Sequence, residues 1–402
     1  MSNAKRKNRL AALIVTAGML VQPLAGITVF AETDAPAAAK TADDTSYTLN
    51  SLEDMKDLMV SITYEQYLSE HENVPAAKNE IMIDVTDYNK ELSRGEITVN
   101  SSDTVVRDGK EEKAGTVTTT DEGRLVYDVD IPEEAMYNVT VEYFPVEGNG
   151  ATIERILLID GRIPFSEARY MNFSRIWKDL EEKGYSREAR TFKVDINRNE
   201  MRPVKTEAPE WCTVTLSDSQ MFYVEPLKFY FDKGKHTLAF ESASEPLKIA
   251  SIKLHTVKPL LTYEEYLEKY KNVPDAGIDE IIMINAETPL TTSEQVIYAM
   301  NDRTSAATVP QATDATLLNT IGGNGGDKWK TQGQWIEWTF EVPETGMYYI
   351  IPRFKQTINA GLFSSRKLYI DGEVPFSSFR ALPFGYGQSW RMETDADENG
   401  RP

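Results

Sequence analysis

The chain has 402 residues, enough for two or three domains that each bury a core of their own. Its formal net charge is −20, and hydrophobic residues make up 41% of the sequence. This acidic balance excludes an electrostatic attraction to nucleic acid or anionic membranes, and it favours neutral ligands or cations. The single cysteine, Cys212, excludes an intramolecular disulfide, so stability has to come from a core or a metal.

The first 31 residues are typical of a secretory signal peptide. Four basic residues between positions 5 and 9 precede an apolar run that begins at Leu10, and the run ends at the expected cleavage point, Ala31. Removing residues 1–31 takes away four basic residues and no acidic ones. The formal charge then falls to −24, from 39 basic and 63 acidic residues. We therefore expect a secreted, cell-surface protein with no membrane insertion after cleavage.

The next segment leads into a folded region. Residues 32–50 are rich in Ala, Thr and Asp and are expected to form a disordered linker. Residues 51–74 have helical spacing, and Thr63 with Gln66 forms a capping box for a short helix. We expect this helix to pack against one end of the β-rich region that follows, although a partner site is the alternative.

Two stretches of the sequence occur twice. The stretch around Pro132 returns around Pro343, an offset of 343 − 132 = 211, with the same alternation of apolar and polar residues. The helical segment of Tyr64 returns at Tyr263, an offset of 263 − 64 = 199, with a second capping box. We therefore expect one β-module in two copies, joined by a helical connector at 259–279.

The first copy is expected to occupy residues 75–258. Its strands include one at 125–131, in which Leu125, Tyr127, Val129 and Ile131 face inward. The polar residues 92–120 are expected to be loop and edge strand. Further strands are expected at 81–83, 221–224, 227–231, 237–240 and 249–254.

The second copy is expected to occupy residues 280–402. Its strands are expected at 282–284, 336–342, 347–354 and 368–370. By comparison with the first copy, it stops at Pro402 without counterparts of the closing strands. We therefore expect this module to be incomplete and the chain to be a fragment.

Many short strands, with turn signals every eight to twelve residues, predict an all-β fold of tandem antiparallel β-sandwiches, each led by a short capped helix. Several motifs also carry a resemblance, at 335–338, 342–343, 346–348, 368–372 and 234–238. They resemble the core of carbohydrate-binding modules of families 6 and 35, which are galactose-binding-like jelly rolls. The helix-led arrangement resembles the N-terminal region of large bacterial extracellular solute-binding proteins of sugar ABC importers. That resemblance implies an ABC permease partner, reached through a domain beyond Pro402.

The resemblance to the modules also implies a sugar-stacking aromatic residue in the loop after the Asp-Gly strand end. In the first copy this residue is Trp177, helped by Arg169, Tyr170 and Asn172. The corresponding residues of the second copy are Trp390, Tyr386 and Arg380. The alternative is that each Trp caps a core. The ligand-binding Asn that family members often have on the last strand is absent from 249–252, which counts against sugar binding.

A metal is the one cofactor that the sequence suggests. Asp395, Asp397 and Asn399 precede Gly400 with the spacing of a calcium-binding loop, in which alternating oxygen ligands surround the ion. A polar hairpin tip is the favoured alternative for this segment.

Catalysis has little support, because the three histidines show no spacing typical of a metal site or a catalytic triad. We do not expect an enzyme. The expected function is a secreted, non-catalytic glycan-binding region at the front of a carbohydrate-uptake protein. The alternatives are structural or adhesive spacer modules, and accessory domains of a glycoside hydrolase.

Overall fold

The computed structural model describes residues 62–107, 109–277, 281–323, 328–358 and 360–392. The expected signal peptide and linker lie outside the described residues, as do residues 51–61 of the expected helical segment and the calcium-loop residues Asp395, Asp397 and Asn399. Within the described part, no helix is long and apolar enough to span a membrane.

The elements of the first copy are, in chain order, α2 (Tyr64–Glu70), β1 (Ile81–Ile83), β2 (Ile97–Arg107), β3 (Lys110–Thr119), β4 (Arg124–Ile131), β5 (Ala135–Phe144), β6 (Ile153–Ile159), the 3-10 helix η1 (Ser166–Arg169), β7 (Met171–Phe173), β8 (Trp177–Asp179), β9 (Lys193–Val194), β10 (Glu200–Met201), β11 (Lys205–Glu207), β12 (Cys212–Thr215), β13 (Phe229–Phe231), β14 (Gly234–Ser244) and β15 (Leu247–His255). Those of the second copy are α3 (Tyr263–Lys269), β16 (Thr291–Thr292), β17 (Ala299–Met300), β18 (Thr320–Ile321), β19 (Ile336–Glu337), β20 (Phe363–Arg366), η3 (Ser377–Arg380) and β21 (Leu382–Gly385).

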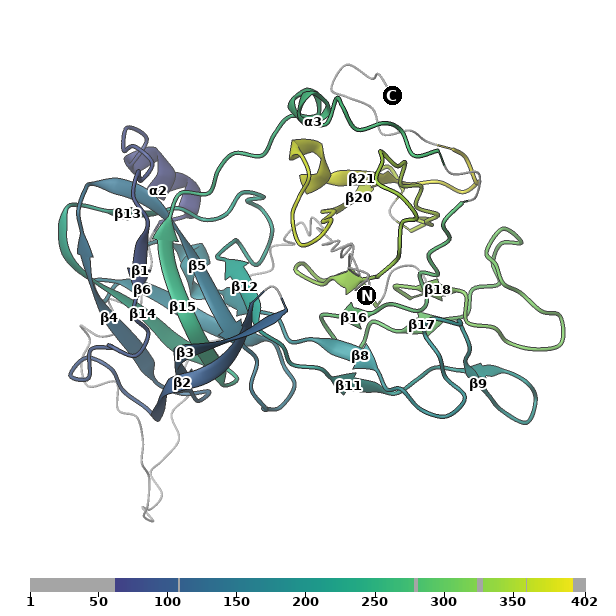
Figure 1. The fold of residues 1–402 in the computed structure, drawn as a ribbon, viewed down its shortest axis with the longest axis horizontal. Helices are drawn as coiled ribbons and strands as arrows, with labels where there is room; N and C mark the ends of the chain where they lie inside the picture. Colours follow the sequence, from purple (N-terminus) through teal and green to yellow (C-terminus); the bar gives the residue numbers. More distant parts are fainter. Residues whose placement is uncertain (1–61, 108, 278–280, 324–327, 359, 393–402) are drawn as a thin grey trace, which may run out of the picture.

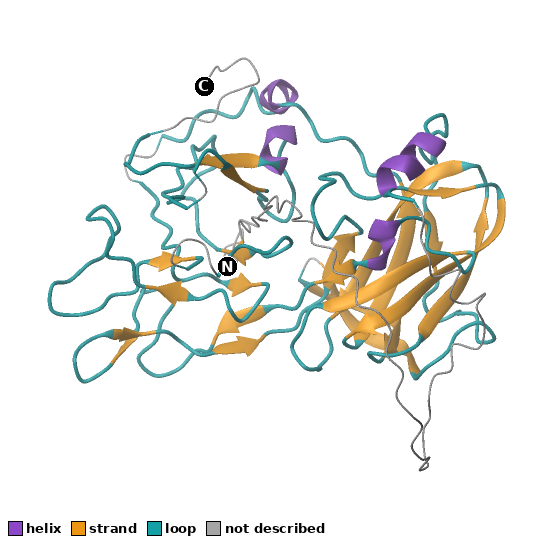
Figure 2. Ribbon diagram, turned by 180° about the vertical axis from the view of Figure 1, so that it is seen from behind, coloured by secondary structure: helices purple, strands orange, loops and turns teal. Residues whose placement is uncertain are grey.

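Two antiparallel sheets make the first copy a β-sandwich (Figure 1). One sheet has seven strands in the order β12-β5-β15-β3-β2, with β1 beside β15 and β13 beside β5. The other has the order β4-β14-β6-β7. The strand pairs in both sheets are antiparallel. Figure 2 shows that strands and loops dominate the chain, so the expected all-β sandwich fold is confirmed.

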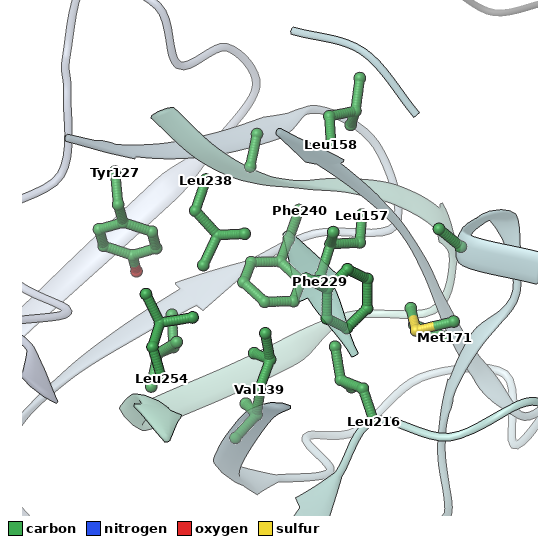
Figure 3. Packing of buried hydrophobic residues seen from close by; sticks show 14 of the residues in the cluster. Tyr127, Val139, Leu157, Leu158, Met171, Leu216, Phe229, Leu238, Phe240 and Leu254 are labelled. Carbon is green, nitrogen blue, oxygen red and sulfur yellow. The ribbon is translucent and has the colours of Figure 1, made fainter. Parts of the chain in front are cut away.

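The core lies between these two sheets. The alternation expected for β4 is confirmed, since Leu125, Tyr127, Val129 and Ile131 are all buried. Figure 3 shows Phe229 and Phe240 side by side, with Val139 and Leu157 near them. Burying a side chain of this size contributes about 1.5–3 kcal/mol to folding. The sandwich therefore needs no disulfide for its stability.

The helix α2 closes one end of the sandwich, as expected. Thr63 accepts a hydrogen bond from the backbone of Gln66 and completes a capping box. The rings of Tyr64 and Tyr67 lie 4.7 and 4.9 Å from that of Phe165. Both hydroxyls accept hydrogen bonds from backbone N–H groups of the segment that contains β13, at 2.8 and 2.6 Å. Each tyrosine therefore buries its ring and satisfies its polar end.

Local contacts of the first copy recur in the second at the two sequence offsets. The pairing of β6 with β7 is repeated by β20 with β21, in the same register. The rings of Tyr263 and Tyr266 on α3 both lie 5.0 Å from Phe376, as those of α2 lie near Phe165. Asp160 and its counterpart Asp371 have φ angles of 52° and 53° in equivalent turns. The repeated sequence thus forms the same local structures, whereas the tandem pair of sandwiches stays a prediction.

Of the expectations for the first copy, one holds only in part and one is wrong. Residues 92–120 form the long strands β2 and β3. β2 lies at the edge of the sheet, as expected, but β3 is an inner strand between β15 and β2 instead of a loop. Thr and Val residues on these strands suit a pleated sheet that is buried on one face. Residues 221–224 form a turn instead of a strand, since the Asp218 carboxylate accepts three nearby backbone N–H groups. The edge strand next to β5 is β12, which the sequence did not indicate.

Most strands expected in the second copy do not form. Residues 282–284 and 347–354 contain no strand, only Ile336–Glu337 of the segment 336–342 pairs as β19, and residues 368–370 make one isolated bridge. In the first copy the equivalent strands are paired by β12, β13, β14 and β15. Among the described residues, no segment takes these places in the second copy. Apolar side chains such as Tyr349, 94% exposed, therefore face solvent.

Residues 177–207, which we call the arm, leave the sandwich and lie against the second copy (Figure 1). The arm contributes β8 and β11 to a four-stranded sheet with the order β11-β8-β16-β19. Tyr185 and Phe192 of the arm share a buried cluster with Ala299 and Leu318. Nε of Arg190 donates a hydrogen bond of 2.5 Å to Oε1 of Glu287. The two copies are therefore held together by strand pairing, apolar contacts and charge.

Candidate ligand-binding groove on the seven-stranded sheet

The structure places Trp177 inside the junction between the two copies. It begins β8, pairs with Glu207 on one side and Thr292 on the other, and is only 7% exposed. A Cβ atom added at Gly150 would lie 3.4 Å from its ring. Trp177 therefore presents no open ring face to a sugar in this arrangement, and its stacking role stays a prediction.

The residues expected to help Trp177 lie on other elements. Arg169 ends η1, and the next residue, Tyr170, is half exposed. Asn172 is on β7, where it pairs with Glu154 of β6. The structure therefore puts these residues on or beside β7, at the edge of the sheet β4-β14-β6-β7. Trp177 lies in the sheet β11-β8-β16-β19.

In the second copy, the three candidate residues lie near the surface. Nε1 of Trp390 donates a hydrogen bond to Oγ of Ser305 at 2.7 Å, and 44% of its surface is exposed. The Tyr386 hydroxyl accepts one from Gln388. Arg380 ends η3 and pairs with Glu225 of the first copy. Burial lowers the pKa of Arg380.

A groove of about 580 Å³ lies elsewhere, on the outer face of the seven-stranded sheet. Its floor follows from the strand register. Glu142 on β5 has Thr213 of β12 beside it on one side and Ser251 of β15 on the other. The next row across the sheet contains Thr140 and Lys253. Side chains at alternate positions of these strands point away from the core, so the polar ones gather on one face.

The hairpin of β2 and β3 forms one wall of this groove. After a register shift between Asn100 and Asp103, its outer half bends over the sheet. Nζ of Lys248 contacts the Asp103 carboxylate at 2.9 Å. Nε1 of Trp211 donates a hydrogen bond of 3.2 Å to the Thr104 carbonyl oxygen. These contacts fix the wall before any ligand arrives, which lowers the entropy cost of binding.

Apolar side chains border the polar floor. Val106 on the hairpin and Met82 on β1 are both largely exposed and line the groove. Trp211 is half-buried at its rim, with its ring centre 5.4 Å from that of Phe144. The groove thus combines a fixed aromatic ring and apolar edges with a polar floor.

The charged groups of the floor are paired. Nε and Nη2 of Arg107 donate to the two oxygens of Glu142 at 2.7 and 2.6 Å, and Nη1 donates to Glu112 at 3.1 Å. The hydrogen bonds that Arg107 donates to Glu142, opposed in part by burial, raise the pKa of Arg107. This geometry holds the Glu142 carboxylate in one orientation, between two hydroxyl groups.

Two hydroxyl groups of the floor are free to bind a ligand. Within the described residues, neither Thr213 nor Ser251 has a side-chain hydrogen-bond partner, whereas Thr140 contacts Thr215 and His255 at 2.8 and 2.7 Å. A hydroxyl can donate one hydrogen bond and accept two, so this row suits a partner that also carries hydroxyl groups.

A second hollow of about 640 Å³ is more open. It lies beside β1 and the turn before β14, and its lining residues include no aromatic ring. For metals, no group of three His, Cys, Asp or Glu side chains among the described residues could hold an ion. The groove on the seven-stranded sheet is therefore the strongest candidate site.

Sequence analysis missed this groove. Thr213, Glu142 and Ser251 are more than 100 residues apart at the extremes and meet only through strand register. The available signal was the alternation of polar and apolar residues along 139–143, together with Trp211 directly before the Cys-Thr-Val-Thr segment of β12. It was overlooked because β12 was not assigned.

No family model matches the chain, and no curated protein is similar enough to match. Among solved structures, the chain is similar to a family 35 carbohydrate-binding module from Clostridium thermocellum, with a TM-score of 0.24 and 12% identity. The match covers 44% of this chain and 99% of that module. A family 35 module from Cellvibrio japonicus matches with a TM-score of 0.24 and 11% identity, over 45% of this chain and 95% of the module.

A module of a Cellvibrio mixtus lichenase, in complex with cellotriose, matches with a TM-score of 0.21 and 13% identity. That match covers 44% of this chain and 98% of the module. The chain is thus similar to carbohydrate-binding modules of families 35 and 6, the families that its sequence motifs resemble. None of these three structures is described as a solute-binding protein. Similarity at this level says nothing about the ligand of this chain.

Proposed function

We propose that this chain binds glycans without catalysis, through the groove on the seven-stranded sheet. The observation that carries the proposal is the row of Thr213, Glu142 and Ser251 beside the half-buried ring of Trp211. Free hydroxyls and a fixed carboxylate can bind sugar hydroxyls, while an indole edge and apolar side chains suit the C–H face of a pyranose.

The shape and charge of the groove support the same class of ligand. An open surface groove, bordered by Met82 and Val106, admits an extended chain. A protein with a net charge of −20 favours uncharged partners. One aromatic contact contributes about 1 kcal/mol beyond area burial, so the affinity for a single site is expected to be weak.

The test is a calorimetric titration of the full chain with a panel of soluble plant, host and cell-wall oligosaccharides. The informative variant is Thr213→Val with Ser251→Ala, because these hydroxyls bind nothing in the protein and their loss should leave the fold intact. The matched control is Trp390→Ala, which removes an exposed aromatic outside the groove.

We expect at least one oligosaccharide to bind the wild type, with affinity lost in the double variant and unchanged in the control. Loss of binding in Trp390→Ala alone would move the site to the second copy. If no oligosaccharide binds, glycan binding is wrong and the spacer function takes its place.

We also propose that the protein is exported and takes part in carbohydrate uptake, with an ABC permease as its eventual partner. The signal-type N-terminus and the resemblance to solute-binding proteins of sugar importers support this setting. N-terminal sequencing of the mature protein from a secreting host tests export. We expect it to begin at Glu32, and an intact Met1 would contradict cleavage.

A further inference from the structure

The charged side chains that line the groove balance one another. Arg107 and Lys253 are the cations, and Glu80 and Glu142 are the anions. Lys253 lies 3.6 Å from Glu80, and Arg107 is bound by Glu142. Burial, together with the nearby Lys253 charge, lowers the pKa of His255, so this residue adds no positive charge near neutral pH. Because Glu112 also pairs with Arg107, a ligand meets a polar surface without net positive charge.

The guanidinium of Arg107 is already occupied on every nitrogen. Glu142 takes Nε and Nη2 in a bidentate pair, and Glu112 takes Nη1. A bidentate pair is the same arrangement that an incoming carboxylate would need. The carboxylate of an acidic sugar would have to displace Glu142, whose side chain is held between Thr213 and Ser251.

We propose that the Arg107–Glu142 pair makes the groove select neutral glycans over glycans that carry carboxylate groups. This inference rests on the proposed glycan binding and names the residues that set its specificity. Glu142 already accepts the two parallel hydrogen bonds that the Arg107 guanidinium could offer to a ligand carboxylate, and its charge repels a second carboxylate at short range. A neutral sugar can still bind the free hydroxyls on either side.

The test compares oligosaccharides of the same linkage and length that differ only in oxidation at C6, such as a short glucan and the oligoglucuronate made by oxidising that glucan. The full chain is titrated with both members of each pair at low and at physiological salt. We expect the wild type to prefer the neutral member by at least about tenfold. A hydrogen bond to a charged group contributes enough free energy for a change of this size.

The decisive variant is Glu142→Gln, which keeps the side-chain shape but removes the competing charge. It should shift the preference toward the acidic member by about tenfold, because Arg107 becomes free to bind a carboxylate. The double variant Arg107→Gln with Glu142→Gln should return the preference to the neutral member. Glu264→Gln on α3 gives the same change in net charge far from the groove strands, and it should have no effect.

If Glu142→Gln does not fold, Arg107→Gln provides a second test. It removes the cation and leaves the Glu142 charge unpaired in the groove, so the preference for the neutral member should increase several-fold. Equal binding of both members by the wild type overturns the inference, as does an unchanged ratio in these variants, while glycan binding itself would stand. A wild type that binds no glycan overturns the proposed function instead.

Discussion

At the scale of single residues, buried charges secure the first copy. Arg175 and Glu245 are 1% and 2% exposed and lie 2.6 Å apart. Glu245 also accepts hydrogen bonds from the backbone of Asn149 and Ala151. The pair thereby fixes the loop between β5 and β6, because the Glu245 carboxylate binds both the backbone of this loop and the side chain of Arg175.

Replacing Glu245 should therefore be costly. We expect Glu245→Ala to lower the free energy of unfolding by about 3 kcal/mol, because it leaves Arg175 partly unpaired in the interior. Arg198→Ala is the control, since Arg198 and Asp314 form an ion pair that is mostly exposed. Its loss should cost less than about 1 kcal/mol. Urea denaturation measures both, and equal losses would contradict the buried pair's importance.

A second residue, His236, makes the stability of the folded protein depend on pH. Burial lowers the pKa of His236. The hydrogen bond and the charge of Asp160, 2.7 Å away, together with the contacts to Asp232, raise it by more. The net result is a pKa above 6.5. Because the folded value exceeds the unfolded one, this stabilisation is fully present below about pH 6.5 and is lost as the pH rises through the folded pKa.

His236→Gln should therefore lower the melting temperature more at pH 5.5 than at pH 8.5. The difference should correspond to at most about 1 kcal/mol, because Asp160 is half exposed and solvent screens the pair. Thermal melts of wild type and variant at the two pH values measure it. A loss of the same size at both values would show that the histidine acts only through packing.

At the scale of elements, the sequence predicted the structure best where the signal is local, such as a strand with alternating apolar and polar residues or a helix with a capping box. The alternation at Leu125–Ile131 and the two capping boxes are local signals, and the structure confirms both. Sequence analysis missed the inner strand β3 and the strand β12. β3 begins with a run of charged residues, and β12 is only four residues long, so both depend on pairing with strands that lie far away in the sequence.

The candidate site was unpredictable for a related reason. A groove on a sheet face depends on which residue of one strand lies beside which residue of the next. The row at Glu142 joins three strands through pairings that the sequence does not encode locally. Trp177, the aromatic residue that sequence reasoning favoured most, lies at a junction instead, because β8 of the arm pairs with β16 of the second copy.

The arm gives a prediction at this scale. Arg190 binds Glu287 and the Leu318 carbonyl oxygen of the second copy and lies near Glu200. Arg190→Ala should speed amide hydrogen exchange in β8, β11 and β16 and leave β4, β5 and β6 unchanged, because only the junction loses contacts. Exchange that rises equally in all these strands would mean that the arm and the sandwich unfold together.

At the scale of the whole molecule, the two copies share some local structures but not the residues of the groove. At the offset of 211 residues, Thr140 corresponds to Ile351 and Glu142 to Arg353. Ile351 is 81% exposed, and no strand is described on either side of it. The corresponding residues of the second copy therefore do not repeat the polar row of the first.

One glycan should therefore bind per chain. Calorimetry of the full chain with an excess of ligand should give a stoichiometry of one, and a chain with Thr213→Val and Ser251→Ala should bind none. A stoichiometry of two, with one site kept in the double variant, would place a second site in the other copy.

Hydrogen exchange of the full chain, with and without a glycan that binds it, tests the central claim most directly. If the groove is the site, protection should appear in β12 and in the outer half of the hairpin, residues 103–112, because a ligand covers both. The segments 169–177 and 380–390 should exchange as in the free protein. Protection confined to those two segments, with β12 and the hairpin unchanged, would contradict the account.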